Sequence, residues 1–78
     1  MRVNYRPSAL KALNEMPAKD RNAMKSKLAI YAETRAGDVI KMVGTDEWRL
    51  RHGQWRAIFA IKDGILVIRI AHRRKVYK

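Results

Sequence analysis

Two glycine-containing turns in the second half of the chain restrict its fold more than any other feature. Asp63-Gly64 lies between residues 55–62 and residues 65–71, two runs rich in β-branched and aromatic side chains. Asp-Gly in such a place is typical of a type I′ turn that joins two antiparallel strands. Gly53-Gln54 lies between residues 48–52 and the next run, and glycine in the first position favours a type II′ turn. The sequence therefore predicts an antiparallel meander of three strands.

Counting outward from these turns predicts which side chains share a face of the sheet. If each turn holds two residues, the count pairs Lys62 with Ile65, Ala60 with Val67, Ile58 with Arg69, Arg56 with Ala71, His52 with Trp55, Arg51 with Arg56 and Arg49 with Ile58. Directly opposed residues lie on the same face, and neighbours along a strand alternate. The predicted core face collects Trp48, Leu50, Trp55, Ala57, Phe59, Ile61, Leu66, Ile68 and Ile70. The other face collects Arg49, Arg51, Arg56, Arg69 and, just past the last strand, Arg73, with no carboxylate among them.

The first half of the chain has a helical period. Residues 2–6 alternate, which predicts a short first strand, and Pro7 suits the first turn of a helix. Two apolar stripes follow at helical spacing, one on each side of Pro17: Ala9, Leu10, Ala12, Leu13 and Met16, then Met24, Leu28 and Tyr31 with Ala23 and Ala32 alongside. The second helix is predicted over residues 18–35, with Gly37 as the residue that ends it. Residues 39–42 are expected to add a short strand or an extended lead-in.

These elements predict an α+β fold in which a short N-terminal strand is followed by two helices packed on one face of an antiparallel meander. No repeat, low-complexity tract or linker interrupts the 78 residues, so we expect residues 1–78 to form a single domain. The longest apolar run, residues 65–68, is far too short to span a membrane, and the N-terminus lacks the apolar core of a signal peptide. We therefore expect a small soluble intracellular protein with no membrane partner.

The charge of the chain is strongly positive. Eighteen Lys and Arg residues against seven Asp and Glu residues give a net charge of +11. A field of this sign attracts nucleic acid, an anionic membrane or an acidic protein. Arg51 is predicted to lie opposite Arg56, where two like charges repel each other. Arginine stems can cover an apolar sheet while their heads reach water, but five arginines on one face favour binding of an anion such as phosphate.

Common catalytic and metal-binding motifs are missing from the sequence. It contains no cysteine, which excludes a disulfide, a thiol nucleophile and a thiolate metal site. His52 and His72 do not make a metal cluster, and neither Ser8 nor Ser26 has a histidine and aspartate arranged beside it. No glycine-rich phosphate loop is present. We therefore expect neither a metal ion nor a cofactor.

The last seven residues, 72–78, form a basic tail that begins where the last predicted strand ends. Such a tail is either a frayed terminus without specific contacts or a segment docked on the sheet. Val76 and Tyr77 are too apolar for a purely solvating tail, which favours docking beside the arginines.

Three segments, in the right order, carry a resemblance to a known family. They are Lys41-Met42-Val43-Gly44, then Trp48-Arg49-Leu50-Arg51-His52-Gly53-Gln54-Trp55-Arg56-Ala57-Ile58-Phe59, then Ile70-Ala71-His72-Arg73-Arg74-Lys75-Val76-Tyr77. With these segments the chain resembles the RelE/ParE toxin superfamily over nearly its whole length. The most specific parts are the Arg-x-Arg-x-Gly-x-aromatic-Arg segment and the His-Arg-x-x-Val-Tyr ending.

The resemblance implies a bacterial, cytoplasmic toxin of a type II toxin–antitoxin system, neutralised in a hetero-oligomer by a cognate acidic antitoxin. In the RelE branch the toxin inhibits translation as an mRNA interferase, which enters the ribosomal A site and cleaves the messenger RNA there. The 2′-hydroxyl attacks the neighbouring phosphate, so this reaction requires no metal or cofactor. We predict this branch. The alternatives are a ParE-like toxin that inhibits DNA gyrase without being a nuclease, and an inactive relative that only binds antitoxin.

The resemblance also implies roles for individual residues. Arg49 and Arg51 occupy strand positions where well-studied members have lysines, and a guanidinium is a poor proton-transfer group because it does not deprotonate in proteins. The predicted catalytic residues are Arg51, Arg56 and Arg73, which would hold the scissile phosphate, and Tyr77, which would be the general base. The predicted RNA-binding residues are Arg49, Arg69, Arg74, Lys75 and Lys78. His72 is a second candidate acid or base, but the strand count places it on the core side, which favours a structural role.

Overall fold

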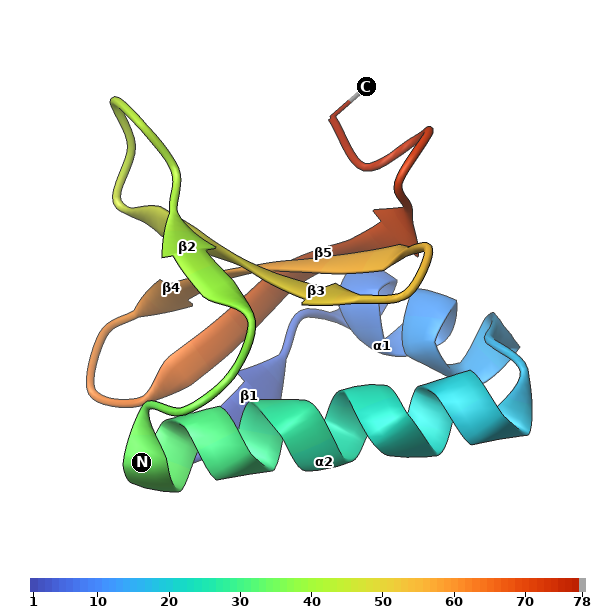
Figure 1. Cartoon of the computed structure of the whole chain (residues 1–78), viewed down its shortest axis with the longest axis horizontal. Coiled ribbons are helices and arrows are strands. Elements are labelled where there is room, and N and C mark those ends of the chain that lie inside the picture. The colour runs from blue at the N-terminus through green and yellow to red at the C-terminus, as the bar shows by residue number, and fades with distance from the viewer. Residues whose placement is uncertain (78) are drawn as a thin grey trace.

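Two helices and a five-stranded sheet make up residues 1–77, the part of the chain that this computed structural model describes (Figure 1). In chain order the elements are β1 (Val3–Tyr5), α1 (Pro7–Glu15), α2 (Ala18–Thr34), β2 (Val39–Lys41), β3 (Glu47–His52), β4 (Trp55–Ile61) and β5 (Ile65–His72). The strands lie in the order β1-β5-β4-β3-β2. The predicted α+β class is confirmed, with the two helices on one face of the sheet.

The sheet is mixed rather than wholly antiparallel. The pairs β2–β3, β3–β4 and β4–β5 are antiparallel, whereas β1 runs parallel to β5. Parallel neighbours need a long connection between them, and here both helices and the three other strands intervene. As a result, β1 forms one edge of the sheet and pairs with β5, which would otherwise be an edge strand.

The helices begin where the prolines predict, but α2 ends differently. Its last turn is closed by Arg35, which has a left-handed φ of 63° and donates its N–H to the Tyr31 carbonyl oxygen at 2.9 Å. The hydroxyl oxygen of Thr34 accepts the N–H of Ala36 at 3.1 Å. The prediction that Gly37 ends the helix is wrong. Arg35 takes the left-handed conformation in its place, and the Thr34 hydroxyl accepts the next backbone N–H, that of Ala36. Within residues 1–77, neither helix combines the length and the apolar character needed to cross a membrane.

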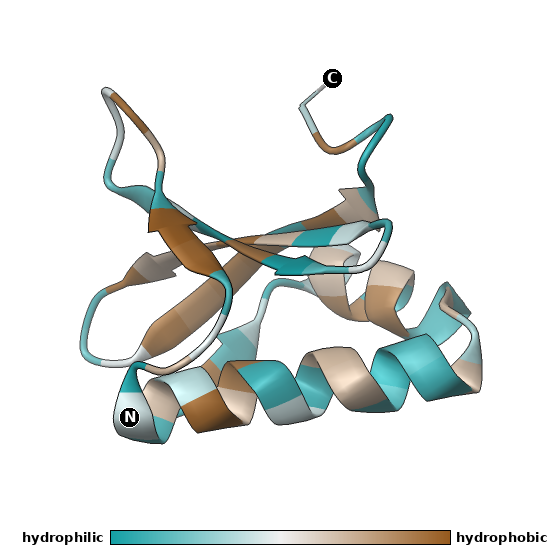
Figure 2. Cartoon of the chain, viewed as in Figure 1, coloured by the Kyte–Doolittle hydropathy of each residue, from teal (hydrophilic) through white to brown (hydrophobic). Residues whose placement is uncertain are grey.

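The core lies between the helices and the sheet. Phe59 on β4 is fully buried at its centre, and its ring lies 5.5 Å from the ring of Tyr31 on α2. Figure 2 shows the most hydrophobic segments in the strands, whereas much of α2 is hydrophilic on its outer side. The buried side chains of this core cluster are Ala9, Leu13, Met16, Met24, Leu28, Tyr31, Ala32, Leu50, Ala57, Phe59, Ile65, Val67 and Ile70. Leu10, predicted as part of the first apolar stripe, is 44% exposed.

The β3–β4 hairpin has the register that the sequence predicts. His52 pairs with Trp55, Arg51 with Arg56 and Arg49 with Ile58. Gly53 has a φ of +53°, as the first position of a type II′ turn requires. The predicted two-residue turn at Gly53-Gln54 is therefore confirmed.

The β4–β5 hairpin departs from the count near its turn. Ile61 pairs with Ile65 and Phe59 with Val67, so the predicted partners Ile65 for Lys62 and Val67 for Ala60 are wrong. The turn holds three residues, 62–64, because Gly64 packs against the backbone of Arg2 and the next amide, that of Ile65, donates to the Arg2 carbonyl oxygen.

A β-bulge restores the predicted register in the second half of this hairpin. Ile68 has no partner on β4, and beyond it Ile58 pairs with Arg69 and Arg56 with Ala71, as counted. The core therefore receives Ile65, Val67 and Ile70, whereas the predicted core residues Leu66 and Ile68 are only half-buried and line a hollow on the opposite face.

We expect Gly64→Ala to destabilise the fold. Gly64 has a φ of +127°, and a Cβ there would lie 3.0 Å from the Arg2 carbonyl oxygen, which is fixed by its hydrogen bond to Ile65. The free energy of unfolding, measured by urea denaturation, should fall by about 2–3 kcal/mol. The matched control is Gly53→Ala, where φ is +53° and no atom lies within 4 Å, and its loss should stay near 1 kcal/mol. Equal losses in the two variants would contradict the role of the contact with Arg2.

Candidate functional site

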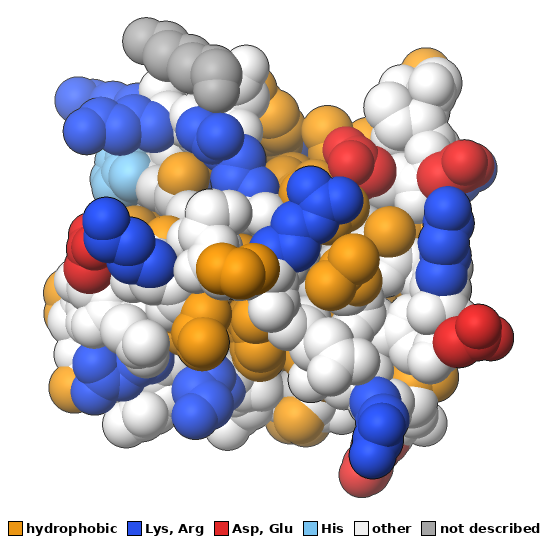
Figure 3. Space-filling view, turned by 180° about the vertical axis from the view of Figure 1, so that it is seen from behind, with side chains coloured by type: hydrophobic (Ala, Val, Ile, Leu, Met, Phe, Trp, Pro, Cys, Tyr) orange, Lys and Arg blue, Asp and Glu red, His pale blue; other side chains and the backbone are white. Residues whose placement is uncertain are grey.

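Four arginines lie together on the face of the sheet that the helices leave open. We call Arg49, Arg51, Arg56 and Arg69 the arginine face. Arg49 pairs with Ile58, which pairs with Arg69, and Arg51 pairs with Arg56. Since opposed residues share a face, these registers bring the four side chains together as the sequence count predicts. Seen from behind, Lys and Arg side chains gather near the C-terminal tail, with hydrophobic side chains between the tail and the β2–β3 loop (Figure 3).

Three of these guanidinium groups donate to neutral oxygens. Arg49 Nη1 donates to the Tyr77 hydroxyl oxygen at 3.0 Å, and Arg69 Nη2 to the Lys75 carbonyl oxygen at 3.0 Å. Arg56 Nη1 donates to the carbonyl oxygens of Gly53 and Trp55 at 2.8 and 2.9 Å. Neutral acceptors hold the side chains in place without cancelling their positive charge.

Arg51 differs because it pairs with a carboxylate. Its Nε donates to Asp38 Oδ2 at 2.7 Å. The expectation that no carboxylate accompanies the arginines is therefore wrong. Asp38 directly precedes β2, whose first residue Val39 pairs with Leu50. The sequence left open whether this segment is a strand, so it gave no register that would have placed Asp38 beside Arg51.

The positive charges act on one another. The pKa of Arg56 is lowered from its ordinary value, first by partial burial and then by the neighbouring charges of Arg49 and Arg51, with a smaller contribution from Arg73. Tyr77 acts in the opposite direction on the same pKa. Arginine stays protonated at neutral pH, so the cluster is a persistent concentration of positive charge that an anion would relieve.

The tail is docked rather than frayed. The N–H of Arg73 donates to the Gln54 carbonyl oxygen at 2.7 Å, and the N–H of Val76 donates to the His72 carbonyl oxygen at 3.1 Å. Val76 is only 3% exposed, and its burial turns the chain back so that the Tyr77 hydroxyl reaches Arg49. Among the predicted RNA-binding residues of the tail, Arg74 and Lys75 are exposed, and Lys78 lies outside the described residues.

His72 lies on the core side of the sheet, as the count places it. Its ring meets Trp55 edge-on, with the centroids 5.8 Å apart and the planes at 77°. Its Nδ1 accepts the N–H of Arg74 at 3.3 Å. These contacts orient the ring toward packing and away from the arginine face.

His52 forms a network that the sequence analysis missed. Its Nδ1 lies 2.8 Å from Lys27 Nζ and its Nε2 lies 3.1 Å from Asp20 Oδ1. A neutral imidazole satisfies both partners, because Nδ1 accepts from the ammonium group while Nε2–H donates to the carboxylate. The network ties α2 to the β3–β4 turn next to Arg51. Among residues 1–77, no three His, Asp or Glu side chains gather as metal ligands.

Solved structures share this fold. The crystal structure of the RelB-RelE antitoxin-toxin complex from Methanococcus jannaschii matches with a TM-score of 0.79 and 21% identity, over 95% of this chain and 94% of that chain. The archaeal RelE-RelB complex from Pyrococcus horikoshii OT3 matches with a TM-score of 0.78 and 25% identity, over 96% and 97%. The isolated E. coli RelE toxin matches with a TM-score of 0.78 and 21% identity, over 90% and 81%.

The sequence itself matches a family model. Comparison with curated proteins finds no match. The model that describes the ParE toxin of the type II toxin–antitoxin system parDE matches residues 3–77. This span includes all seven elements of the fold and the arginine face. The chain therefore belongs to the RelE/ParE family of type II toxin–antitoxin toxins.

Proposed function

We propose that this toxin is an endoribonuclease that cleaves messenger RNA in the ribosomal A site, and so inhibits translation. The observation that carries the proposal is the contact between Arg49 Nη1 and the Tyr77 hydroxyl oxygen, 3.0 Å long, beside the other arginines. In this contact an ionisable oxygen that could act as a general base lies next to cations that could bind a phosphate. This combination fits attack by a 2′-hydroxyl on the adjacent phosphate.

In this mechanism the 2′-oxygen forms a bond to phosphorus while the bond from phosphorus to the 5′-oxygen breaks. Tyr77, acting as the phenolate, accepts the proton of the 2′-hydroxyl, and the leaving 5′-oxygen takes a proton from water. Arg51, Arg56 and Arg73 offset the negative charge that grows on the pentavalent phosphorus. A single well-placed donor of this kind stabilises a transition state by about 2.7–4 kcal/mol.

Other basic residues would position the strand on either side of the cut. Arg49 and Arg69 lie on the sheet beside Arg56, and Arg74 and Lys75 are exposed on the tail. Phosphate contacts of this kind set register and orientation without reading bases. Lys78 belongs to the same proposed set by its place in the sequence.

We also infer that an acidic antitoxin is the natural partner. The chain carries a net charge of +11, and the similar structures include toxin-antitoxin complexes. A segment that is acidic and apolar would pair with the arginines and cover the half-buried Leu66 and Ile68. Such a segment would gain both electrostatic and hydrophobic free energy on binding.

Inhibition of DNA gyrase is the second candidate function. The family model that matches is named for ParE toxins. In addition, Arg49 and Arg51 stand where the best-studied nucleases have lysines, and a guanidinium cannot take over proton transfer from a lysine. An inactive relative that only binds antitoxin is the third. The three functions make different predictions for a change at Tyr77.

Tyr77→Phe should lower the rate of cleavage of ribosome-bound message by about 10²–10⁴-fold, because it removes the proposed base and keeps the ring. The measurement is single-turnover cleavage on programmed ribosomes. Tyr5→Phe is the matched control, since it deletes a hydroxyl from β1, outside the arginine face. Arg73→Ala should lose comparable activity through weaker phosphate stabilisation.

Unchanged cleavage by Tyr77→Phe would contradict the role of Tyr77 as base. If the parent protein cuts no message but inhibits gyrase supercoiling, the gyrase function replaces the nuclease. If it does neither and still binds antitoxin, the protein is an inactive relative.

The complex with the antitoxin should weaken as salt is raised. Screening shortens the Debye length from about 10 Å at 0.1 M salt to about 3 Å at 1 M. We expect the dissociation constant, measured by titration calorimetry with the antitoxin encoded beside the toxin gene, to rise at least about tenfold over this range. Equal affinity at both salt concentrations would contradict the electrostatic part of the partner assignment.

A further inference from the structure

Among residues 1–77, one carboxylate forms an ion pair with the arginine face, and it comes from the segment before β2. Asp38 Oδ2 accepts from Arg51 Nε at 2.7 Å, and the Asp38 carbonyl oxygen accepts the N–H of Arg51 at 3.0 Å. Asp38 thus extends the β2–β3 ladder by one residue beyond the pair of Val39 with Leu50. Leu50 is buried in the core. Because side chains alternate along a strand, Asp38 and Arg51 point to the open face.

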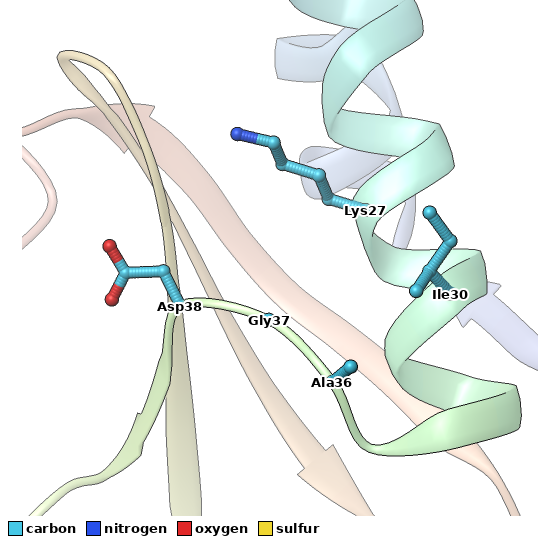
Figure 4. A pocket seen from close by; sticks show the side chains of 5 residues that line it. All are labelled: Lys27, Ile30, Ala36, Gly37 and Asp38. Carbon is cyan, nitrogen blue, oxygen red and sulfur yellow. The ribbon is translucent and has the colours of Figure 1, made fainter.

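Asp38 has no second cation to satisfy it among the described residues. Figure 4 shows the Asp38 carboxylate directed away from Lys27, on the far side of the segment that joins α2 to β2. Lys27 Nζ instead lies 2.8 Å from His52 Nδ1. A cavity of about 210 Å³ between α2 and this segment is lined by Lys27, Ile30, Ala36, Gly37 and Asp38. The backbone of Asp38 is held by β3, because its carbonyl oxygen accepts the N–H of Arg51 at 3.0 Å.

We propose that Asp38 guards Arg51 in the free protein, so that a polyanion gains the contact with Arg51 only by displacing a carboxylate. The inference rests on the proposed function in one respect, namely that the arginine face binds RNA. Carboxylate and phosphate oxygens are alternative acceptors for one guanidinium. Arg49, Arg56 and Arg69 donate to neutral oxygens and keep their full charge for phosphate, whereas the charge of Arg51 is compensated.

The guard has a physical purpose in a chain with a net charge of +11. A protein this basic attracts any nucleic acid through contacts with phosphates alone. By pairing with Arg51, Asp38 leaves one cation fewer for this non-specific binding. A strand seated by the other arginines brings its phosphate close to Arg51 at high local concentration, so it can replace the carboxylate. The same ion pair also offsets the repulsion between Arg51 and Arg56 in the free protein.

The size of the effect follows from the exposure of the pair. The two side chains are 54% and 50% exposed, and such pairs are weak in water. Freeing Arg51 should therefore tighten binding of a single strand by up to about fivefold at low salt. One additional phosphate contact should steepen the slope of log affinity against log salt by up to about 0.7.

The test compares binding of a 2′-O-methyl oligonucleotide, which the 2′-hydroxyl mechanism cannot cleave, to the parent protein, to Asp38→Asn and to Asp63→Asn. Fluorescence anisotropy from about 50 to 200 mM salt gives affinity and slope. Asp63→Asn is the matched control, because it makes the same charge change in the β4–β5 turn, where φ is +52° and asparagine is tolerated. We expect Asp38→Asn to bind more tightly with a steeper slope, and Asp63→Asn to change binding less.

A second arm locates the gain at Arg51. Arg51→Gln should weaken binding more in the Asp38→Asn background than in the parent, where Asp38 already occupies the guanidinium. If the parent binds and Asp38→Asn binds no tighter than Asp63→Asn, the guard is overturned while RNA binding stands. If neither the parent nor Asp38→Asn binds at the lowest salt, the proposed RNA function fails, and the guard fails with it. Thermal melts of all variants identify any loss caused by unfolding.

Discussion

Both helices pack on the same face of the sheet, and the other face is shaped by the lack of a second helical layer among residues 1–77. The two helices fill one side with apolar side chains around Phe59. The opposite side must then be compatible with water along the strands β3, β4 and β5. Arginine meets that demand, because its stem covers apolar sheet and its head carries charge into solvent. The open face of the sheet therefore carries exposed positive charge that can bind anions.

The bulge at Ile68 changes which residues of β5 point into the core. Ile65 and Val67 point into the core, and strict alternation would send Arg69 there too. The unpaired Ile68 shifts the period, so that Arg69 points outward and Ile70 inward. The sequence could not reveal this shift, because residues 65–68 are apolar at every position and either register would bury an apolar set. The polar pattern of β3 was unambiguous, and there the register was predicted correctly.

The parts of the site that the sequence predicts and those that it does not differ in how far apart the contacting residues lie along the chain. The positions of Arg49, Arg51 and Arg56 are predictable because the two-residue turn at Gly53-Gln54 sets the register of β3 and β4. Asp38 and the partners of His52 come from segments 13, 25 and 32 residues distant. The hydrophobic periodicity of a segment does not predict where a helix end or a three-residue strand packs in the tertiary structure. The docking of the tail was inferred from the apolar character of Val76 and Tyr77, but its contact with Arg49 depends on the fold of the whole sheet.

Like charges packed at adjacent positions of a sheet would ordinarily oppose folding. Here the guanidinium groups of Arg49, Arg56 and Arg69 donate to carbonyl and hydroxyl oxygens, which hold them in place without neutralising them. Carboxylates in these places would have stabilised the free protein more and left little field for a ligand. The pKa of Arg56 is lowered first by burial and then by the charges of Arg49 and Arg51. Repulsion between the arginines therefore persists in the free protein, and an arriving anion would offset it.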